Sequence, residues 1–187
     1  MKTQRRLAEI LKTMMAETPL DEISVSSLAA KAGINRKTFY YHFHDVYDLL
    51  TLVFLSEKID RITKATNPQE VFDLIYTYYT KNGKFIDATL RSAGRELLIE
   101  FIYNNLFTSF MKFIILHSEG KKIPLNVRKA ISRFYGYAFA NSIVYFFSNT
   151  KVKTKIMYSK SLNVVEKDFL EKAILAALKK RDLDGNI

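Results

Sequence analysis

The feature that most restricts the fold of this sequence is the recurrence of apolar residues at helical spacing along almost its whole length. On the first predicted helix, for example, Leu7, Leu11 and Met15 follow one another at intervals of four residues. The 187 residues include only six glycines and three prolines, which leaves little material for β-hairpin turns. The pattern therefore predicts an all-α fold.

The ends of the predicted helices are marked by residues that start or stop helices. The first helix ends near Thr18-Pro19, because proline disfavours helix in the residue before it. Asn67-Pro68-Gln69-Glu70 combines a cap, a proline at the first helical position and a glutamate that can reach back. The further predicted helices cover residues 25–32, 36–42, 45–64, 68–81, 93–117, 125–148 and 161–181.

Two short predicted helices flank a tight glycine turn, an arrangement typical of a helix-turn-helix unit. Ser24 and Asn35 have side chains that commonly cap helix starts, and Gly33 can adopt the left-handed conformation that follows a helix end. In the second helix Phe39 faces inward and leaves the polar residues beside it on the outer face. The first turn of that helix is expected to enter the major groove of DNA.

Residues 23–43 read Ile-Ser-Val-Ser-Ser-Leu-Ala-Ala-Lys-Ala-Gly-Ile-Asn-Arg-Lys-Thr-Phe-Tyr-Tyr-His-Phe, and Asp45 and Leu49 follow them. This stretch closely resembles the N-terminal domain of the tetracycline-repressor (TetR) family, with the small residues, the glycine and the aromatic run all in register. The resemblance implies a helix-turn-helix DNA-binding domain with a connecting helix over residues 1–60. It also implies a helical regulatory and dimerisation domain over residues 61–187.

The resemblance implies roles for individual residues of the second short helix. Arg36 corresponds to a base-reading position, and arginine can donate two hydrogen bonds to guanine O6 and N7. Lys37 and Tyr41 are similarly placed to touch bases or adjacent phosphates, and the neighbouring polar residues match positions that hold the DNA backbone. The predicted DNA-binding residues are Ser24, Asn35, Arg36, Lys37, Thr38, Tyr40, Tyr41 and His42, with phosphate contacts from Lys2, Arg5 and Arg6 on an N-terminal arm.

The chain departs from the family pattern at the start of the fourth helix. Many members carry a lysine there that contacts phosphate, whereas this chain has Val46. The expectation is that only the backbone amides at the start of that helix supply the contact here.

The formal net charge of +10 does not lie in the predicted DNA-binding domain. Residues 1–60 contain eight Lys/Arg and eight Asp/Glu, whereas residues 61–187 contain twenty-one and eleven. The case for DNA binding therefore depends on where the charges lie. No acidic residue occurs between Glu119 and Glu166, and two interpretations of this basic stretch stay open: a solvated surface, or a docking site for an acidic protein or an anionic effector.

The aromatic residues of the C-terminal region also have two interpretations. They fill a core or a dimer interface, or some of them line an effector cavity, since ligand sites are mostly apolar with a few polar groups. The family resemblance implies a cavity somewhere among these residues, and the two interpretations stay open; the residues predicted to line a cavity are Tyr76, Tyr79, Phe101, Phe107, Tyr135 and Phe139.

The sequence lacks residues and motifs that several classes of function require. The chain has no cysteine, which excludes disulfides and thiolate zinc sites. His42 and His44 are two residues apart, hence on different helix faces, and nothing in the sequence completes a metal shell around them. There is no phosphate-binding glycine loop, nucleophile elbow or zinc-protease helix. We therefore expect no enzyme activity, no cofactor and no metal.

No export signal or membrane span is predicted, because charged residues interrupt the apolar stretches. Residues 97–116 contain Glu100 and Lys112, and residues 131–147 contain Arg133. The second stretch is also shorter than the roughly 18–20 residues that a span needs. A cytoplasmic protein without a membrane association is expected.

Together these features predict a dimeric repressor that binds double-stranded DNA at a near-palindromic operator. Helices 125–148 and 161–181 are expected to form the two-fold interface. A small-molecule or protein effector in the C-terminal domain would then change the separation of the two reading helices through helix 45–64. The alternatives are a helical adaptor that docks an acidic protein, and an activator that works with a co-regulator.

Overall fold

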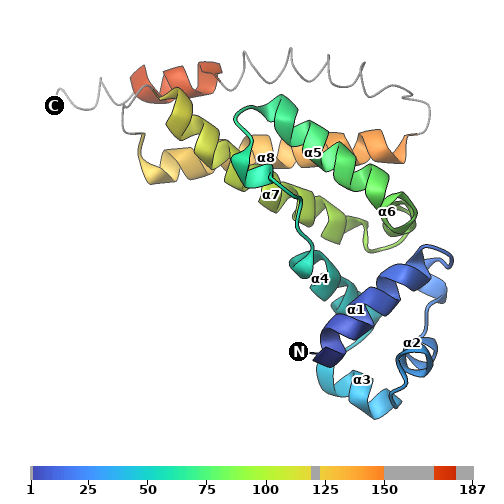
Figure 1. Cartoon of the computed structure of the whole chain (residues 1–187). Helices are drawn as coiled ribbons and strands as arrows, with labels where there is room; N and C mark the ends of the chain where they lie inside the picture. The colour runs from blue at the N-terminus through green and yellow to red at the C-terminus, as the bar shows by residue number, and fades with distance from the viewer. Residues whose placement is uncertain (1, 119–122, 150–170, 180–187) are drawn as a thin grey trace. The chain divides into compact units, whose positions relative to one another are not determined.

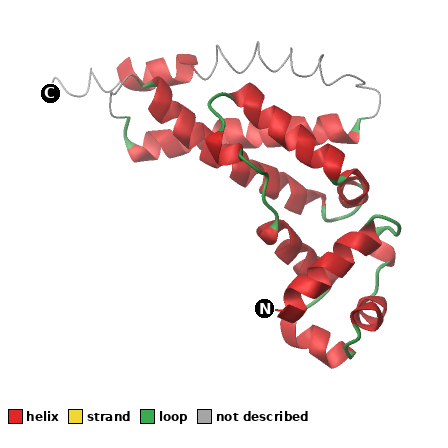
Figure 2. Cartoon of the chain, in the orientation of Figure 1, coloured by secondary structure: helices red, strands yellow, loops and turns green. Residues whose placement is uncertain are grey.

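The computed structural model describes residues 2–118, 123–149 and 171–179, and its regular elements there are all helical (Figures 1 and 2). This confirms the all-α prediction. In chain order the elements are α1 (Lys2–Met15), the 3-10 helix η1 (Leu20–Glu22), α2 (Val25–Ala32), α3 (Arg36–His42), α4 (Val46–Ser56), the 3-10 helix η2 (Ile62–Lys64), α5 (Pro68–Lys81), α6 (Gly83–Leu90), α7 (Arg95–His117) and α8 (Leu125–Ser148). Residues 171–179 are also helical, and the predicted start of that helix at residue 161 lies outside the described residues.

The chain forms two compact units, and neither is one continuous segment. The first unit comprises residues 1–58 and 78–101, and the second comprises residues 59–77 and 102–187. The chain therefore crosses between the units three times, after Lys58, after Thr77 and after Phe101. The expected division into residues 1–60 and 61–187 stays a prediction.

In the first unit, helix α1 packs against α2, α4 and α6. The side chains of Leu7 and Leu11 on α1, and of Leu49 and Leu50 on α4, are fully buried. Each such leucine contributes roughly 1.5–3 kcal/mol of transfer free energy to folding. The helical spacing seen in the sequence is therefore the spacing of this core.

In the second unit, helices α7 and α8 approach closely at Gly136. A Cβ atom on Gly136 would lie 3.1 Å from the ring of Tyr103. One helical turn to either side of Gly136, Ser132 and Ala140 are also fully buried. On the neighbouring surface Tyr103 stacks on Tyr137 with ring centroids 3.9 Å apart. Small residues on α8 thus make room for the aromatic rings of α7.

The predicted caps at the helix starts are confirmed. The side chains of Ser24 and Asn35 accept hydrogen bonds from backbone amides three residues later, at 3.1 and 2.8 Å, and Asp45 makes the same contact at the start of α4, at 2.8 Å. Glu70 reaches back as expected, although its carboxylate accepts from the Thr66 amide, one residue before the cap. This hydrogen bond lowers the pKa of Glu70. Local side-chain signals therefore set where these helices begin.

The predicted helix 45–64 is wrong beyond Ser56, where α4 ends. Glu57 adopts an extended conformation, with φ −70° and ψ 145°, and Arg61 has a left-handed backbone with φ 63°. A bulky residue with positive φ is incompatible with a continuous helix. Ile59 and Ile62 are buried in a segment that is mostly irregular. Their spacing in the sequence resembles that of a helix, and for this reason the predicted helix was too long. Helix α6, between two predicted helices, was not expected.

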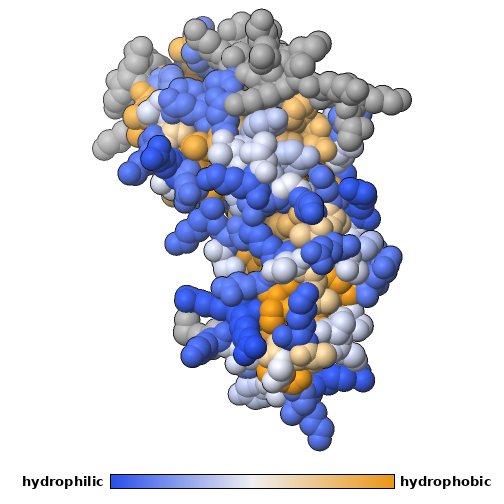
Figure 3. Space-filling model, turned by 45° about the vertical axis from the view of Figure 1, so that its right-hand side comes forward, coloured by the Kyte–Doolittle hydropathy of each residue, from blue (hydrophilic) through white to orange (hydrophobic). Residues whose placement is uncertain are grey.

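The surface visible in Figure 3 is largely hydrophilic, with smaller apolar patches. Within the described ranges, no helix combines the length and the apolar character that crossing a membrane requires. Glu100 on α7 and Arg133 on α8, which interrupt the two apolar stretches of the sequence, are both exposed.

Candidate DNA-binding site

Helices α2 and α3 form the predicted helix-turn-helix, joined by Gly33, Ile34 and Asn35. Gly33 has φ 64°, and the amides of Gly33 and Ile34 donate to the last carbonyls of α2 at 3.1 and 3.0 Å. These bonds satisfy backbone groups that a helix end otherwise leaves without partners. The turn therefore ends α2 and starts α3 within three residues.

Gly33→Ala is expected to lower the free energy of unfolding by about 1–2 kcal/mol, because an L side chain in the left-handed region meets its own carbonyl. No other atom lies within 4 Å of the added Cβ, so the cost comes from the backbone alone. Urea unfolding followed by circular dichroism measures it. The matched control is Gly83→Ala, where the Cβ is equally unobstructed but φ is not positive. An equal effect in both variants would contradict the prediction.

Helix α3 has one buried side and one exposed side. Phe39 is completely buried and lies against Phe43, with ring centroids 5.6 Å apart. On the other side Tyr41 is 85% exposed and Tyr40 is 50% exposed. Arg36 and Lys37 in the first turn are also exposed, while Thr38 and His42 are half-buried. Helix α3 therefore presents cationic and phenolic side chains on its exposed side. The buried ring of Phe39 anchors the helix in the core.

Several predicted DNA contacts already have partners within the helix pair. Asn35 Oδ1 accepts from both the amide and the hydroxyl of Thr38, at 2.8 and 3.1 Å. The hydroxyl of Ser24 accepts from the Ser27 amide at 3.1 Å. The Arg36 guanidinium lies 5.9 Å from the ring centroid of Tyr40, one helical turn away. These contacts hold the ends of the helices and restrain Arg36 before any DNA is present.

The charges around α3 are cationic. Lys31 at the end of α2 is exposed, as are Arg36 and Lys37. No acidic residue occurs from Ile23 to His44. This local excess of positive charge, in a region without net charge overall, favours a polyanion on this side of the helix pair.

Lys2, Arg5 and Arg6 belong to the first two turns of α1, and the expectation that they lie on an N-terminal arm is wrong. All three are exposed, and the first turn of α1 contains no acidic residue. Cations at a helix N-terminus are repelled by the positive end of the helix dipole. A nearby phosphate would be attracted by the cations and by the dipole.

Two carboxylates lie at the start of α4, where a phosphate contact to the backbone amides is expected. Val46 is buried, and the Asp45 carboxylate already accepts the Asp48 amide. The Asp48 carboxylate accepts the His44 amide at 3.0 Å. Two carboxylates at this position disfavour a phosphate, and the expected contact stays a prediction.

A hydrogen bond missed by sequence reasoning joins α4 to η1. The Tyr47 hydroxyl donates to the Asp21 carboxylate at 2.5 Å. This bond, burial and the charge of Asp21 raise the pKa of Tyr47. The two residues are 26 positions apart, so no local pattern in the sequence pairs them.

The six aromatic residues predicted to line an effector cavity are divided between the two units. Tyr79 and Phe101 belong to the first unit and the other four to the second. In the second unit Tyr135 and Phe139 lie against Phe110, with centroids 6.1 and 5.6 Å from its ring. The remaining two are beside other rings, Phe107 at Tyr103 and Tyr76 at Phe72. The effector cavity stays a prediction.

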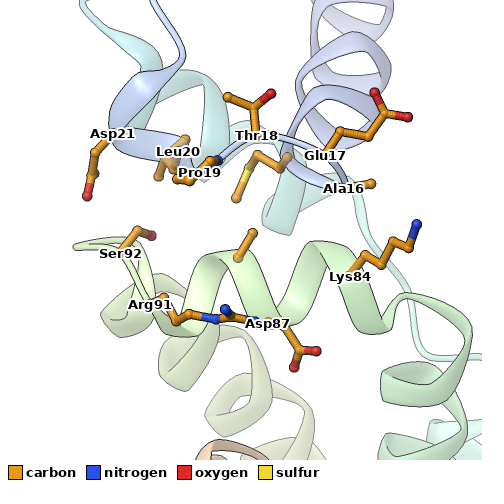
Figure 4. Close-up of a pocket in the computed structure, with 12 residues that line it drawn as sticks. Ala16, Glu17, Thr18, Pro19, Leu20, Asp21, Lys84, Asp87, Arg91 and Ser92 are labelled. Carbon is orange, nitrogen blue, oxygen red and sulfur yellow. The ribbon is translucent and has the colours of Figure 1, made fainter.

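A hollow of about 340 Å³ lies within the first unit, between the end of α1 with η1 and the helix α6 (Figure 4). Its lining is mixed: Met15 and Leu20 are buried, while Glu17, Lys84 and Arg91 are exposed. None of the six predicted cavity residues lines it.

Within the described ranges, no three potential metal-ligating side chains form a group.

The fold and the exposed helix α3 define a helix-turn-helix protein with a larger helical remainder. Residues 66–168 match the TetR family model described as a transcriptional regulator C-terminal region, which is more than half of the chain. The chain therefore belongs to the TetR family of transcriptional regulators. Among curated proteins, no match is found.

Several solved structures are similar to this chain in fold. The dihydroxyacetone kinase operon activator DhaS is 18% identical, with a TM-score of 0.57 and 97% of each chain covered. A TetR-family transcriptional regulator from Streptomyces coelicolor is 12% identical, with a TM-score of 0.56 and coverage of 95% of this chain and 89% of that one. The TetR family repressor AlkX from Dietzia sp. Strain DQ12-45-1b is 16% identical, with a TM-score of 0.56 and coverage of 91% and 96%.

Proposed function

We propose that this protein is a dimeric, sequence-specific repressor that binds a near-palindromic operator and is released by an effector. The observation that supports this function best is the exposed side of α3, where Arg36, Lys37 and Tyr41 project from a helix anchored by Phe39. Such a helix fits the major groove, the groove in which all four base pairs differ. No catalytic step, cofactor or membrane association is part of the proposal, and the proposed location is the cytoplasm.

Each side chain of α3 has a proposed role on DNA. Arg36 grips a guanine edge, and its placement over Tyr40 reduces the entropy lost on binding. Lys37 and Tyr41 touch bases or adjacent phosphates. Ser24, Asn35, Thr38, Tyr40 and His42 hold the backbone, as do Lys2, Arg5 and Arg6 on α1.

The proposed dimer interface is the exposed face of α8. Phe134, Tyr137 and Tyr145 are 71%, 50% and 60% exposed and share one face of the helix. Leu175, on the helical segment 171–179, is also 55% exposed. Covering such large apolar side chains with a second copy would remove them from water. Two-fold symmetry would then present two α3 helices about 34 Å apart to successive major grooves.

The effector is proposed to bind in the second unit, among the aromatic residues that include Tyr135 and Phe139. The family match over residues 66–168 covers all six residues of the predicted set, which supports a regulatory role for this region. Coupling of this kind is reciprocal, so an effector that weakens DNA binding must bind the DNA complex less tightly.

Arg36→Ala is expected to cost about 1–3 kcal/mol of binding free energy on the selected operator and to relax discrimination at one base position. The measurement is selection from random DNA followed by binding titrations. Tyr40→Phe is the comparison variant, since it keeps the ring under Arg36 and removes only the hydroxyl. It should weaken all sequences similarly. An unchanged base preference after Arg36→Ala would contradict the assignment of Arg36.

The test of the function as a whole is a mobility-shift assay over a salt series, with DNA from the gene's own locus. Sequence-specific binding supports a regulator, whereas binding that depends only on salt supports the helical adaptor. The similarity to an operon activator keeps activation with a co-regulator as a second candidate. A promoter reporter with and without the protein decides between repression and activation.

A further inference from the structure

The hollow of about 340 Å³ in the first unit has two walls of different chemistry (Figure 4). The end of α1 and η1 form one wall, and α6 with the two residues after it forms the other. The hollow shares no lining residue with the second unit, where the effector is proposed to bind. Its volume is at the small end of the roughly 300–1,000 Å³ of ligand sites, which suits a small molecule.

The least exposed residues that line the hollow are apolar. Met15 and Leu20 are only 1% and 2% exposed, and Ala88 on α6 is half-buried. An apolar group of a ligand that covers these side chains is removed from water. This part of the lining therefore favours a ligand with a short apolar chain.

The wall formed by α1 and η1 offers hydrogen-bond acceptors. Pro19 has no N–H to donate to the Met15 carbonyl four residues before it, so the usual helical hydrogen bond is missing at the end of α1. The negative end of the helix dipole lies there as well. Asp21 on η1 is exposed, and its Oδ1 accepts from the Tyr47 hydroxyl, which leaves Oδ2 for a further donor. This wall therefore favours an ammonium group.

The wall formed by α6 is cationic. Lys84 in the first turn of α6 and Arg91 at its end both line the hollow, and both are exposed. Asp87 lies between them in the sequence, and its Oδ1 accepts from the Tyr79 hydroxyl at 3.1 Å. No described carboxylate forms an ion pair with either cation. This wall therefore leaves two cations for an anionic group.

The opposite charges of the two walls do not pair with each other across the hollow. Figure 4 shows Asp21 on one wall and Lys84 and Arg91 on the other, and it shows the Glu17 carboxylate turned away from α6. A ligand that carries both charges bridges the walls with charge-assisted hydrogen bonds that the side chains do not form with one another. The arrangement of charges thus favours a zwitterion over a simple anion or cation.

We propose that the hollow is a binding site for a small apolar zwitterion, a free amino acid with an apolar side chain. Its ammonium lies at Asp21 and the end of α1, and its carboxylate lies at Lys84 and Arg91. Its side chain covers Met15 and Leu20. The unit that contains α3 thereby has a ligand site of its own, in addition to the effector site proposed for the second unit.

The site is tested by calorimetric titration of the full chain with three probes that share one carbon chain. L-leucine carries both charges, 3-methylbutylamine only the ammonium and 4-methylpentanoate only the carboxylate. L-leucine should bind at least about 5-fold more tightly than either of the others. It should also raise the urea unfolding midpoint, because a ligand of the folded state stabilises that state. Absent binding of L-leucine, or equal binding of the three probes, would overturn the proposal.

Charge variants test which wall binds which group. Asp21→Asn keeps an acceptor for the Tyr47 hydroxyl, and it should remove the preference for L-leucine over 4-methylpentanoate. The double variant Lys84→Gln/Arg91→Gln should remove the preference for L-leucine over 3-methylbutylamine. Glu17→Gln, at the carboxylate that is turned away from α6, is the matched control and should change neither preference. Unchanged preferences in the first two variants would overturn the assignment of the walls and the proposal with it.

A size variant tests whether the ligand lies in the hollow. Ala88→Leu places a larger side chain in the lining of α6, and it should abolish L-leucine binding without lowering the urea unfolding midpoint. Wild-type affinity for L-leucine in this variant would contradict the proposed location. The titrations contain no DNA, so their outcome does not depend on the proposed DNA-binding function. Failure to select an operator would contradict that function and leave the ligand site standing.

Discussion

Phe39→Ala is expected to lower the free energy of unfolding by about 3–5 kcal/mol and to abolish operator binding. Phe39 is completely buried, whereas the other six residues of α3 are exposed or half-buried. A helix of that length has no stability of its own and depends on tertiary packing. Truncating the ring leaves a cavity at the junction with Phe43 and removes the anchor that fixes the direction of Arg36 and Lys37.

Urea unfolding and operator titration of the same preparation measure both losses. The matched control is Tyr41→Ala, an aromatic truncation on the same helix at a side chain that is 85% exposed. It should change stability by no more than about 0.5 kcal/mol and still weaken DNA binding. If Phe39→Ala destabilised the protein no more than Tyr41→Ala, the assignment of inner and outer sides to α3 would be wrong.

The second large effect is expected on α8. Replacing both Phe134 and Tyr145 by glutamate should convert the dimer to monomers, because four carboxylates would then face one another across the two-fold interface. A dimer binds its second half-site without a second loss of translational freedom. Monomers should therefore bind the full operator on the order of 100-fold more weakly or worse. Affinity for an isolated half-site should be unchanged.

Sedimentation equilibrium and operator titration check this result. Leu55→Glu is the control, since Leu55 on α4 is 77% exposed and lies outside the proposed interface. That variant should remain dimeric. A dimeric Phe134→Glu/Tyr145→Glu protein would place the interface elsewhere, and a monomeric wild type would contradict the dimer proposal itself.

The DNA-binding helix pair was predictable because its signals are local. Ser24, Asn35 and Asp45 each bond an amide three residues away, and Gly33 adopts its positive φ at the end of α2. Residues so close in sequence meet in any chain that forms these helices. The same reason explains why the bounds of α8 agree with the predicted helix 125–148.

The connection after α4 was not predictable in the same way. Ile59 and Ile62 repeat the apolar spacing of α4, yet the helix ends at Ser56 because Glu57 turns away into extended backbone and Arg61 is left-handed. The pairing of Glu57 with Lys12 spans 45 residues and that of Tyr47 with Asp21 spans 26. Periodicity reports which face of a helix is apolar, and it contains no information about which distant helix covers that face.

The sequence by itself determined the all-α class, the position of the helix-turn-helix and the side of α3 that faces outward, since each depends on contacts within one or two helical turns. Only the tertiary structure decided where α4 ends, where the aromatic residues of the C-terminal region gather and which charges pair. Those outcomes depend on side chains that meet after the helices pack, when burial makes a partner for each polar group necessary.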